Sequence, residues 1–189
     1  MQVSNIILAS KSPRRKELLK LLDLNFKVEV PEVDEVFPED LDVNEVAEYL
    51  ANLKAIAFNN IEANQILITA DTVVILDKQI LGKPKDISEA TKMLKSLSNR
   101  SHKVMTGVCI KSKDRTVSFS NTTKVFFKEL KSSEINYYIE NYKPFDKAGS
   151  YGIQEWIGAI GISKIEGSYF NVVGLPIYQL YKNLKEYFF

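Results

Sequence analysis

Apolar residues occur along the chain both in short unbroken runs and at helical spacing, which predicts strands alternating with helices. Asn5 to Ala9 indicates a short buried strand, and Ile66 to Leu76 indicates a long one. Between them, Ser12 and Pro13 are typical of a helix start, because Ser caps free backbone N–H groups and Pro has no N–H to leave unpaired. Further helices are expected at the capping-box patterns Asp42 with Glu45 and Asp86 with Glu89, and after Pro176.

The second half of the chain predicts a pair of strands, a further helix and a glycine-rich segment. The strands are expected at Lys103 to Lys111 and Thr116 to Phe127, and apolar residues at helical spacing follow between Ile135 and Tyr142. Residues 148–174 hold six of the eight glycines. Since glycine permits tight turns and close approach to a ligand, this segment is either a set of short hairpins or a wall that faces a ligand. The alternation predicts an α/β fold, and the length suits either one compact domain over residues 1–189 or two small lobes that share a sheet.

Composition and charge exclude several classes of function. The chain has 189 residues, of which 45% are hydrophobic and 26% charged, as in a globular protein. Its 25 basic and 24 acidic residues give a net charge of +1, which argues against binding to nucleic acid or to a membrane surface. The single His and single Cys exclude the usual zinc sites. His102 is expected to be a strand residue, because no G-x-S-x-G motif accompanies it. The lone thiol, Cys109, and the lack of a visible signal peptide or spanning segment predict a cytoplasmic protein.

Ser10, Ser12, Arg14 and Arg15 form the first candidate site, at the junction between the first strand and the first helix. Two of the four arginines lie in the first turn of that helix, where cations are normally disfavoured and anions favoured. A bound phosphate would resolve this conflict, since a helix N-terminus offers free N–H groups. The alternative is a helix whose arginines extend into water. The segment lacks the glycines of a Walker phosphate loop.

Lys54 and Asp71 are charged residues at positions expected to be buried. Lys54 falls on the apolar face of its helix, near Leu50 and Phe58, so its ammonium either extends to the rim or faces an anion. Asp71 is the one charged residue in the long strand, and an unpaired buried carboxylate is costly. It must therefore meet a cation, a metal or strong donors. The two interpretations are a functional acid and a salt bridge to a lysine of the core.

Glu35 and Lys83 complete the candidate set. Glu35 lies in an acidic segment that is either a solvated loop or the source of a second carboxylate, which would join Asp71 around a hard cation such as Mg²⁺. Lys83 stands between Gly82 and Pro84 at a strand end, where the simplest interpretation is a charged turn. Taken together, two carboxylates, two arginines and two lysines suit a metal-bound polyphosphate better than acyl transfer or redox chemistry.

At these residues the chain resembles the Maf family of nucleoside triphosphate pyrophosphatases. The similar blocks follow one another in order and cover essentially the whole chain. They include Leu8–Arg15, Val33–Glu35, Lys54–Ala55, Ala70–Val74, Gly82–Pro84, His102–Gly107, Asp146–Gln154 and Val172–Pro176. The resemblance implies a two-lobed α/β fold with a mixed sheet, related to the inosine triphosphate pyrophosphatases, with the active-site cleft between the lobes.

The resemblance also implies an activity and its requirements. The expected reaction cleaves a nucleoside triphosphate between its α and β phosphates, which gives the nucleoside monophosphate and pyrophosphate. A divalent cation, Mg²⁺ or Mn²⁺, is the expected cofactor, and a homodimer is a family-level expectation. One alternative is a regulatory nucleotide binder without turnover. Another is a single-strand nucleic-acid module, which would need a basic groove that the net charge of +1 does not favour.

Roles for individual residues follow from the resemblance as well. Asp71 matches the family's catalytic base, and Glu35 is expected to hold the cation together with it. Lys54 and Lys83 are expected to neutralise the triphosphate during catalysis. The expected substrate-binding positions are Ser10, Arg14, Arg15, Thr72 and Gln154. The positions matching Arg14, Thr72 and Gln154 separate the family's subgroups, and their combination here resembles the subgroup that acts on dTTP and UTP.

Overall fold

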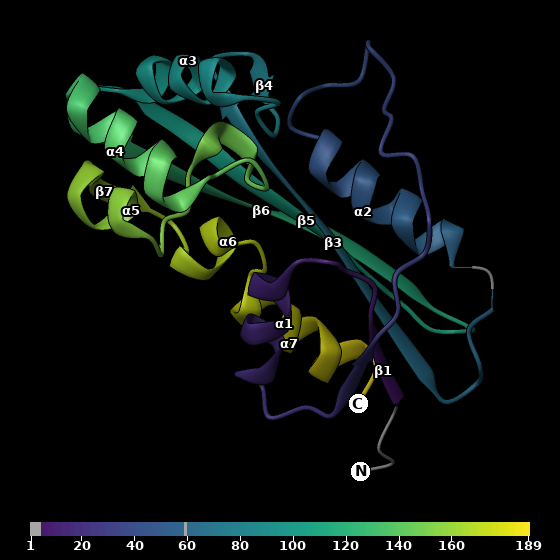
Figure 1. Ribbon diagram of the computed structural model, residues 1–189. Coiled ribbons are helices and arrows are strands. Elements are labelled where there is room, and N and C mark those ends of the chain that lie inside the picture. The colour runs from purple at the N-terminus through teal and green to yellow at the C-terminus, as the bar shows by residue number, and fades with distance from the viewer. Residues whose placement is uncertain (1–4, 59) are drawn as a thin grey trace. The chain divides into compact units, whose positions relative to one another are not determined.

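The fold is built on one seven-stranded mixed sheet, which the computed structural model describes together with its helices over residues 5–58 and 60–189 (Figure 1). The strand order is β2-β1-β3-β5-β6-β7, with β4 paired to β3. Strand β1 is parallel to β2 and β3, whereas the β3–β4 and β6–β7 pairs are antiparallel. The predicted mixed α/β fold is confirmed. The strands are β1 Asn5–Leu8, β2 Phe26–Val28, β3 Gln65–Leu76, β4 Gln79–Leu81, β5 Ser101–Lys111, β6 Thr116–Phe127 and β7 Ile162–Glu166.

Most of the helices begin where the sequence predicts. The Ser12 hydroxyl accepts a hydrogen bond from the Arg15 N–H at 3.4 Å, and the Asp86 carboxylate accepts one from the Glu89 N–H at 2.8 Å. The start predicted at Asp42 is wrong, because the Asp42 carboxylate binds the N–H of Asn44 and the helix begins at Val46. The helices are α1 Pro13–Lys20, α2 Val46–Ala57, α3 Ile87–Leu97, α4 Ser132–Tyr142, the 3₁₀ turn η1 Ala148–Ser150, α5 Trp156–Gly161, α6 Tyr169–Val173 and α7 Ile177–Tyr187. Over residues 5–58 and 60–189, no helix is long and apolar enough to cross a membrane.

The chain divides into two compact units that share three strands. Unit 1 comprises the chain up to Asp71 together with Thr106–Asn121 and Gly174–Phe189. Unit 2 comprises Thr72–Met105 and Thr122–Val173. Strands β3, β5 and β6 each pass from one unit into the other, and β3 does so between Asp71 and Thr72.

In unit 1, small side chains bring α2 close to the sheet. Ala47, Ala51 and Ala55 recur at every fourth position of α2 and are buried, so they form one stripe along the helix. A Cβ built on Gly107 of β5 would lie only 2.3 Å from the backbone of Ala47. The Thr69 hydroxyl of β3 donates a hydrogen bond to the Ala51 carbonyl at 2.6 Å. These contacts fix the helix, and hence every side chain it carries, against β3 and β5.

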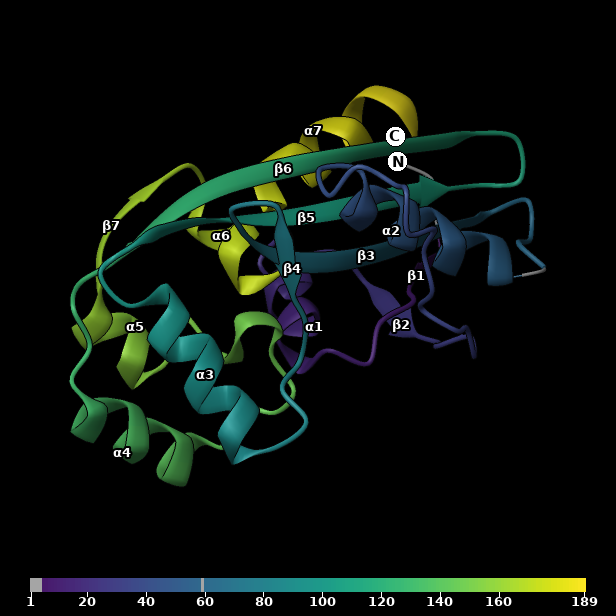
Figure 2. The same cartoon turned by 90° about the horizontal axis from the view of Figure 1, so that it is seen from above.

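In unit 2, helices α3, α4 and α5 group together and pack over an aromatic core (Figure 2). His102 of β5 is buried, stacks on Phe127 at 5.7 Å and lies with its Nε2 2.7 Å from the Tyr151 hydroxyl. Burial lowers the pKa of His102 to about 4, so the ring is neutral near pH 7. The prediction that His102 is a strand residue is confirmed.

The glycine-rich segment differs from the predicted hairpins. Residues 148–174 form the turn η1, two short helices and the single strand β7. Gly149 needs its backbone freedom, because its φ is +68° and a Cβ would lie 3.0 Å from a methyl group of Val74. Helices of five or six residues give too little periodicity to be recognised from sequence. The segment is therefore mainly a set of helical turns.

Candidate active site

The junction predicted to bind phosphate is formed by the end of β1 and the first turn of α1. Ser10 is buried, and its hydroxyl accepts a hydrogen bond from the Ser12 N–H at 3.3 Å. Pro13 opens the helix, and the first turn contains no acidic residue. Arg14 and Arg15 therefore add their positive charge to the positive end of the helix dipole. The local electrostatics favour an anion at this junction.

Arg15 ties the junction to two distant parts of unit 1. Its Nη1 donates hydrogen bonds to the Ser10 hydroxyl at 3.3 Å and to the Ala70 carbonyl at 2.8 Å, and its Nε donates to the Gly174 carbonyl at 2.8 Å. Burial lowers the pKa of Arg15, while the carboxylate of Asp71 raises it. The guanidinium stays charged, because arginine does not lose its proton in proteins. Arg15 is thus a half-buried cation that holds β1, β3 and the chain before α7 together.

Lys54 and Asp71 form a buried ion pair in unit 1. The Lys54 Nζ lies 2.5 Å from Asp71 Oδ1, and the side chains of these two residues are only 11% and 12% exposed. The same Nζ lies 2.9 Å from Glu35 Oε1, whose side chain is 48% exposed. One ammonium therefore binds both carboxylates that the sequence analysis selected. The buried ammonium of Lys54 on α2 and the buried carboxylate of Asp71 on β3 therefore neutralise each other.

The two carboxylates have the chemistry of a site for a hard divalent cation. Glu35 and Asp71 both bind one ammonium, so one oxygen of each lies within 2.9 Å of the same positive charge. Mg²⁺ sites typically use one or two protein carboxylates and take the remaining ligands from water and substrate phosphates. Among residues 5–58 and 60–189 no group of three or more His, Cys, Asp or Glu side chains could hold a metal. The pair thus fits a cation shared with a phosphate substrate better than a closed structural site.

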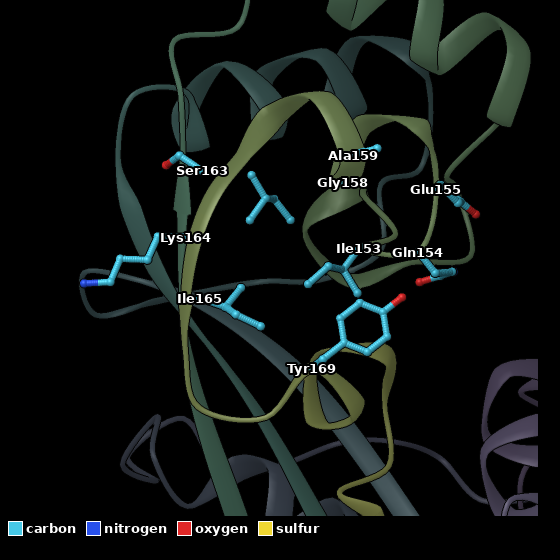
Figure 3. Close-up of a pocket in the computed structure, with 10 residues that line it drawn as sticks. Ile153, Gln154, Glu155, Gly158, Ala159, Ser163, Lys164, Ile165 and Tyr169 are labelled. Atoms are coloured by element: carbon cyan, nitrogen blue, oxygen red, sulfur yellow. The ribbon is translucent and has the colours of Figure 1, made fainter.

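Thr72, Lys83 and Gln154 lie in unit 2. Thr72 is half-buried in β3, directly after Asp71. Lys83 is exposed in the loop after β4, where the Gly82 carbonyl accepts a hydrogen bond from the Gly149 N–H at 3.0 Å. Gln154 is exposed just before α5 and borders a shallow hollow of about 360 Å³ (Figure 3). The assignment of these three residues to a nucleotide site stays a prediction of the resemblance.

The hollow beside Gln154 is lined by residues between Ile153 and Tyr169. Figure 3 shows the Ile153, Ile165 and Tyr169 side chains turned toward it, while the Lys164 side chain extends away. Its wall is therefore mainly apolar and aromatic, with the amide of Gln154 at its edge.

Sequence reasoning missed a cluster of buried polar residues behind Gln154. Tyr138 of α4 is fully buried, and its hydroxyl donates a short hydrogen bond to Glu155 Oε2. Lys147 is also buried, and its Nζ lies 3.1 Å from Glu155 Oε1 and 2.7 Å from Asp146 Oδ1. We call Tyr138, Lys147 and Glu155 the Tyr138 cluster. Tyr138 was predicted only as an apolar position of a helix, because periodicity does not reveal where its hydroxyl binds.

Comparison with known proteins gives a family and close relatives. The family model described as Maf-like protein matches residues 5–187. A Christiangramia forsetii protein named dTTP/UTP pyrophosphatase is 54% identical over 182 residues, which cover 96% of this chain and 93% of that protein. Proteins of the same name from Flavobacterium psychrophilum and Porphyromonas gingivalis are each 52% identical, over 98% and 96% of this chain and 96% and 94% of their own lengths.

Among solved structures, the Staphylococcus aureus Ham1 protein is similar at a TM-score of 0.45 and 18% sequence identity, over 65% of this chain and 71% of that chain. A HAM1 protein from Coxiella burnetii is similar at a TM-score of 0.44 and 18% identity, over 65% and 72% of the two chains.

Proposed function

This chain belongs to the Maf family, and from that membership we propose that it hydrolyses dTTP and UTP to the nucleoside monophosphate and pyrophosphate. The relatives that carry this activity in their names match the chain over nearly their whole length. The observation in the structure that carries the proposal is the ammonium of Lys54 between the carboxylates of Asp71 and Glu35. That arrangement lies in the same unit as the arginine-bearing helix N-terminus.

We propose that Glu35 and Asp71 hold Mg²⁺ or Mn²⁺ during the reaction. Such a cation, when bound, supplies positive charge against the phosphate oxygens and makes water more acidic. The chain supplies further positive charge through Arg14, Arg15 and Lys54. Because the triphosphate is strongly anionic, these cations and the N–H groups of α1 stabilise both its binding and the charge that builds up on the leaving pyrophosphate.

Asp71 is the proposed general base. Its carboxylate accepts a proton from the water whose oxygen attacks phosphorus, while the bond between the α and β phosphates breaks and the electrons of that bond go to the leaving oxygen. Lys54 donates to Asp71 Oδ1, which fixes the orientation of the carboxyl group. Lys83 is assigned to the triphosphate and Ser10 to the phosphate junction, as the resemblance implies.

Gln154 is proposed to read the base. Uracil and thymine present an O4 acceptor beside an N3–H donor, and one carboxamide satisfies both with its NH₂ and its carbonyl. Cytosine presents the reverse pattern, so it is rejected only by an amide that cannot turn over. Thr72 is assigned to the same specificity by the resemblance.

The direct test is pyrophosphate release from the purified protein, measured with a panel of nucleoside triphosphates and Mg²⁺ or Mn²⁺. We expect dTTP and UTP to be the best substrates, and Asp71→Asn to lower their turnover by roughly 10² or more while nucleotide binding stays measurable. Saturable binding without product from the parent protein would instead support the regulatory nucleotide binder. Turnover of Asp71→Asn within a few-fold of the parent would remove Asp71 from the role of base.

The specificity test is Gln154→Ala. We expect kcat/KM for dTTP and UTP to fall by roughly 1–3 kcal/mol in transition-state stabilisation, since a polar edge of the base loses its partner. Turnover of ATP, a poor substrate, is expected to change much less. An equal fall for all triphosphates would show that Gln154 supports the site and does not read the base.

A further inference from the structure

The Tyr138 cluster binds the segment from Lys147 to Glu155, which carries Gln154, at both of its ends and at Gly152. Lys147 stands just before η1 and Glu155 just before α5, and their side chains meet at 3.1 Å. Between them, the Gly152 N–H donates a hydrogen bond to the Tyr138 hydroxyl at 3.0 Å. Burial and the neighbouring Glu155 carboxylate raise the pKa of Tyr138, so its hydroxyl keeps the proton that it donates to Glu155. Each end of the segment and its middle are thus bound to one buried network.

The segment inside this network contains two consecutive residues in the left-handed backbone conformation. Gly149 and Ser150 have φ values of +68° and +63°, and Ser150 adopts this left-handed conformation in spite of its Cβ. A largely buried ion pair such as that of Lys147 with Glu155 is on its own a weak source of stability, because both charges lose much of their hydration. Strained backbone that is held by surrounding contacts occurs preferentially at functional sites. Because neither the left-handed Ser150 nor the Lys147–Glu155 ion pair adds much stability, we look for their role in the function of the segment.

Gln154 lies against the same backbone that the network holds. A Cβ built on Gly152 would lie 2.9 Å from Gln154 Nε2 and 2.8 Å from the carboxyl carbon of Glu155. The amide of Gln154 and the carboxylate of Glu155 therefore both pack on the α-carbon of Gly152. Because Tyr138 and Lys147 fix Glu155, and Tyr138 also binds the Gly152 N–H, they fix the surface on which the amide rests.

We propose that Tyr138, Lys147 and Glu155 are positioning residues that hold the Gln154 carboxamide in the one orientation that accepts uracil or thymine and rejects cytosine. This inference rests on the proposed role of Gln154 in reading the base. An amide that turns over exchanges its donor and its acceptor, and so accepts cytosine as well as uracil. Selectivity against cytosine therefore depends on the network behind the amide as much as on the amide.

The test is a double-mutant cycle on the ratio of kcat/KM for UTP to that for CTP. Tyr138→Phe removes the hydroxyl that binds both Glu155 and Gly152 and keeps the ring. We expect it to lower the UTP/CTP ratio by about tenfold, mainly through faster CTP turnover and a higher KM for UTP, with kcat for UTP little changed. In the Gln154→Ala background the same substitution is expected to leave the ratio unchanged, because Tyr138 acts through Gln154. Tyr142→Phe is the matched control, since this tyrosine stacks on Tyr138 from the same helix at 5.1 Å, and it is expected to leave the ratio as in the parent.

A second variant guards against a folding defect. Lys147→Met removes the ion pair with Glu155 and is expected to lower the UTP/CTP ratio in the same direction, in protein whose thermal unfolding shows it to be folded. If Gln154→Ala lowers the ratio and neither Tyr138→Phe nor Lys147→Met does, the positioning role is refuted and the base-reading role stands. The positioning role is also refuted if Tyr138→Phe lowers kcat/KM for UTP and for CTP by the same factor. It is refuted as well if Tyr138→Phe lowers the UTP/CTP ratio equally far in the Gln154→Ala background. If the parent releases no pyrophosphate, or if Gln154→Ala leaves the ratio unchanged, the failure lies in the proposed function itself.

Discussion

Replacing Lys54 with methionine tests the central electrostatic feature of unit 1. Methionine keeps most of the volume of the side chain and removes the ammonium that binds Asp71 and Glu35. Asp71, with a side chain only 12% exposed, then keeps a buried charge without its nearest cation. Removal of one partner from a buried pair typically costs about 3–5 kcal/mol. We expect a value near the lower end, about 3 kcal/mol, because Arg15 also attracts Asp71. Glu35, at 48% exposure, returns to water and adds little.

The assay is urea unfolding followed by far-ultraviolet circular dichroism and by the fluorescence of the single tryptophan. Trp156 lies in unit 2, so its signal shows whether the destabilisation remains in unit 1 or unfolds both units together. The double variant Lys54→Met with Asp71→Asn is expected to recover most of the lost stability, since no charge is left unpaired. It should nevertheless remain inactive, which separates stability from catalysis.

The matched control is Lys20→Met. Lys20 pairs with Glu17 at the surface, where both side chains are more than half exposed, and its loss is expected to cost less than about 0.5 kcal/mol. A cost below about 1 kcal/mol for Lys54→Met would show that the pair is hydrated in solution and would refute the reasoning. If the double variant is as unstable as Lys54→Met alone, the cause is the packing of methionine and not the unpaired charge.

Three further predictions concern pH, packing and metal. The pKa of His102 is about 4 in the folded protein against an ordinary 6.5, so the unfolded chain binds the proton more readily and stability is lost as the pH falls from about 6.5 to about 4. Between pH 7 and pH 5, the free energy of unfolding measured in urea should fall by about 2 kcal/mol more for the parent than for His102→Gln. Equal losses in the two proteins would contradict the assignment. Gly107→Ala should cost more than about 3 kcal/mol, because its Cβ would lie 2.3 Å from the backbone of α2, whereas Gly82→Ala, with nothing within 4 Å, should leave the unfolding midpoint unchanged. Chelation should abolish pyrophosphate release and added Mg²⁺ or Mn²⁺ should restore it, while activity that survives dialysis against a chelator would rule out the cation at Glu35 and Asp71.

Most of the fold was predictable because its signals are local. Ser12 and Asp86 mark helix starts by the hydrogen bonds of their own side chains, Pro13 marks one by lacking an N–H, and the long strand β3 carries no charge apart from Asp71. Strand β2 gives no such signal, since it has only three residues, none of them buried, and its pairing with β1 is made by the backbone. The last helix was predicted at the right place, and within it Leu180 and Leu184 are buried whereas Tyr181 is 42% exposed. Its phenol has a polar end and does not require burial.

The central site was predictable one residue at a time, but its connections were not. Lys54 and Asp71 each stand out as a charge among apolar neighbours, and two interpretations of Asp71 were open: a functional acid or a partner of a core lysine. The structure shows the second, because Asp71 pairs with Lys54, and the role of Asp71 as a functional acid stays a prediction. The contacts of Arg15 could not be predicted, since the carbonyls of Ala70 and Gly174 that it binds are chemically the same as those of every other residue.

The hydrogen bond from Arg15 to Gly174 spans 159 residues, and this has a consequence for the order in which the protein folds on the ribosome. Synthesis runs from the N-terminus, so Arg15 emerges long before its acceptor does. The segments of unit 2 end at Val173, whereas unit 1 requires the final segment Gly174–Phe189. Contacts between such distant residues also form late, because closing the long loop costs entropy before the contact is gained. The arginine junction at the start of α1 therefore cannot close until Gly174 has been synthesised and can fold onto it, although both Ser10 and Arg15 emerge early.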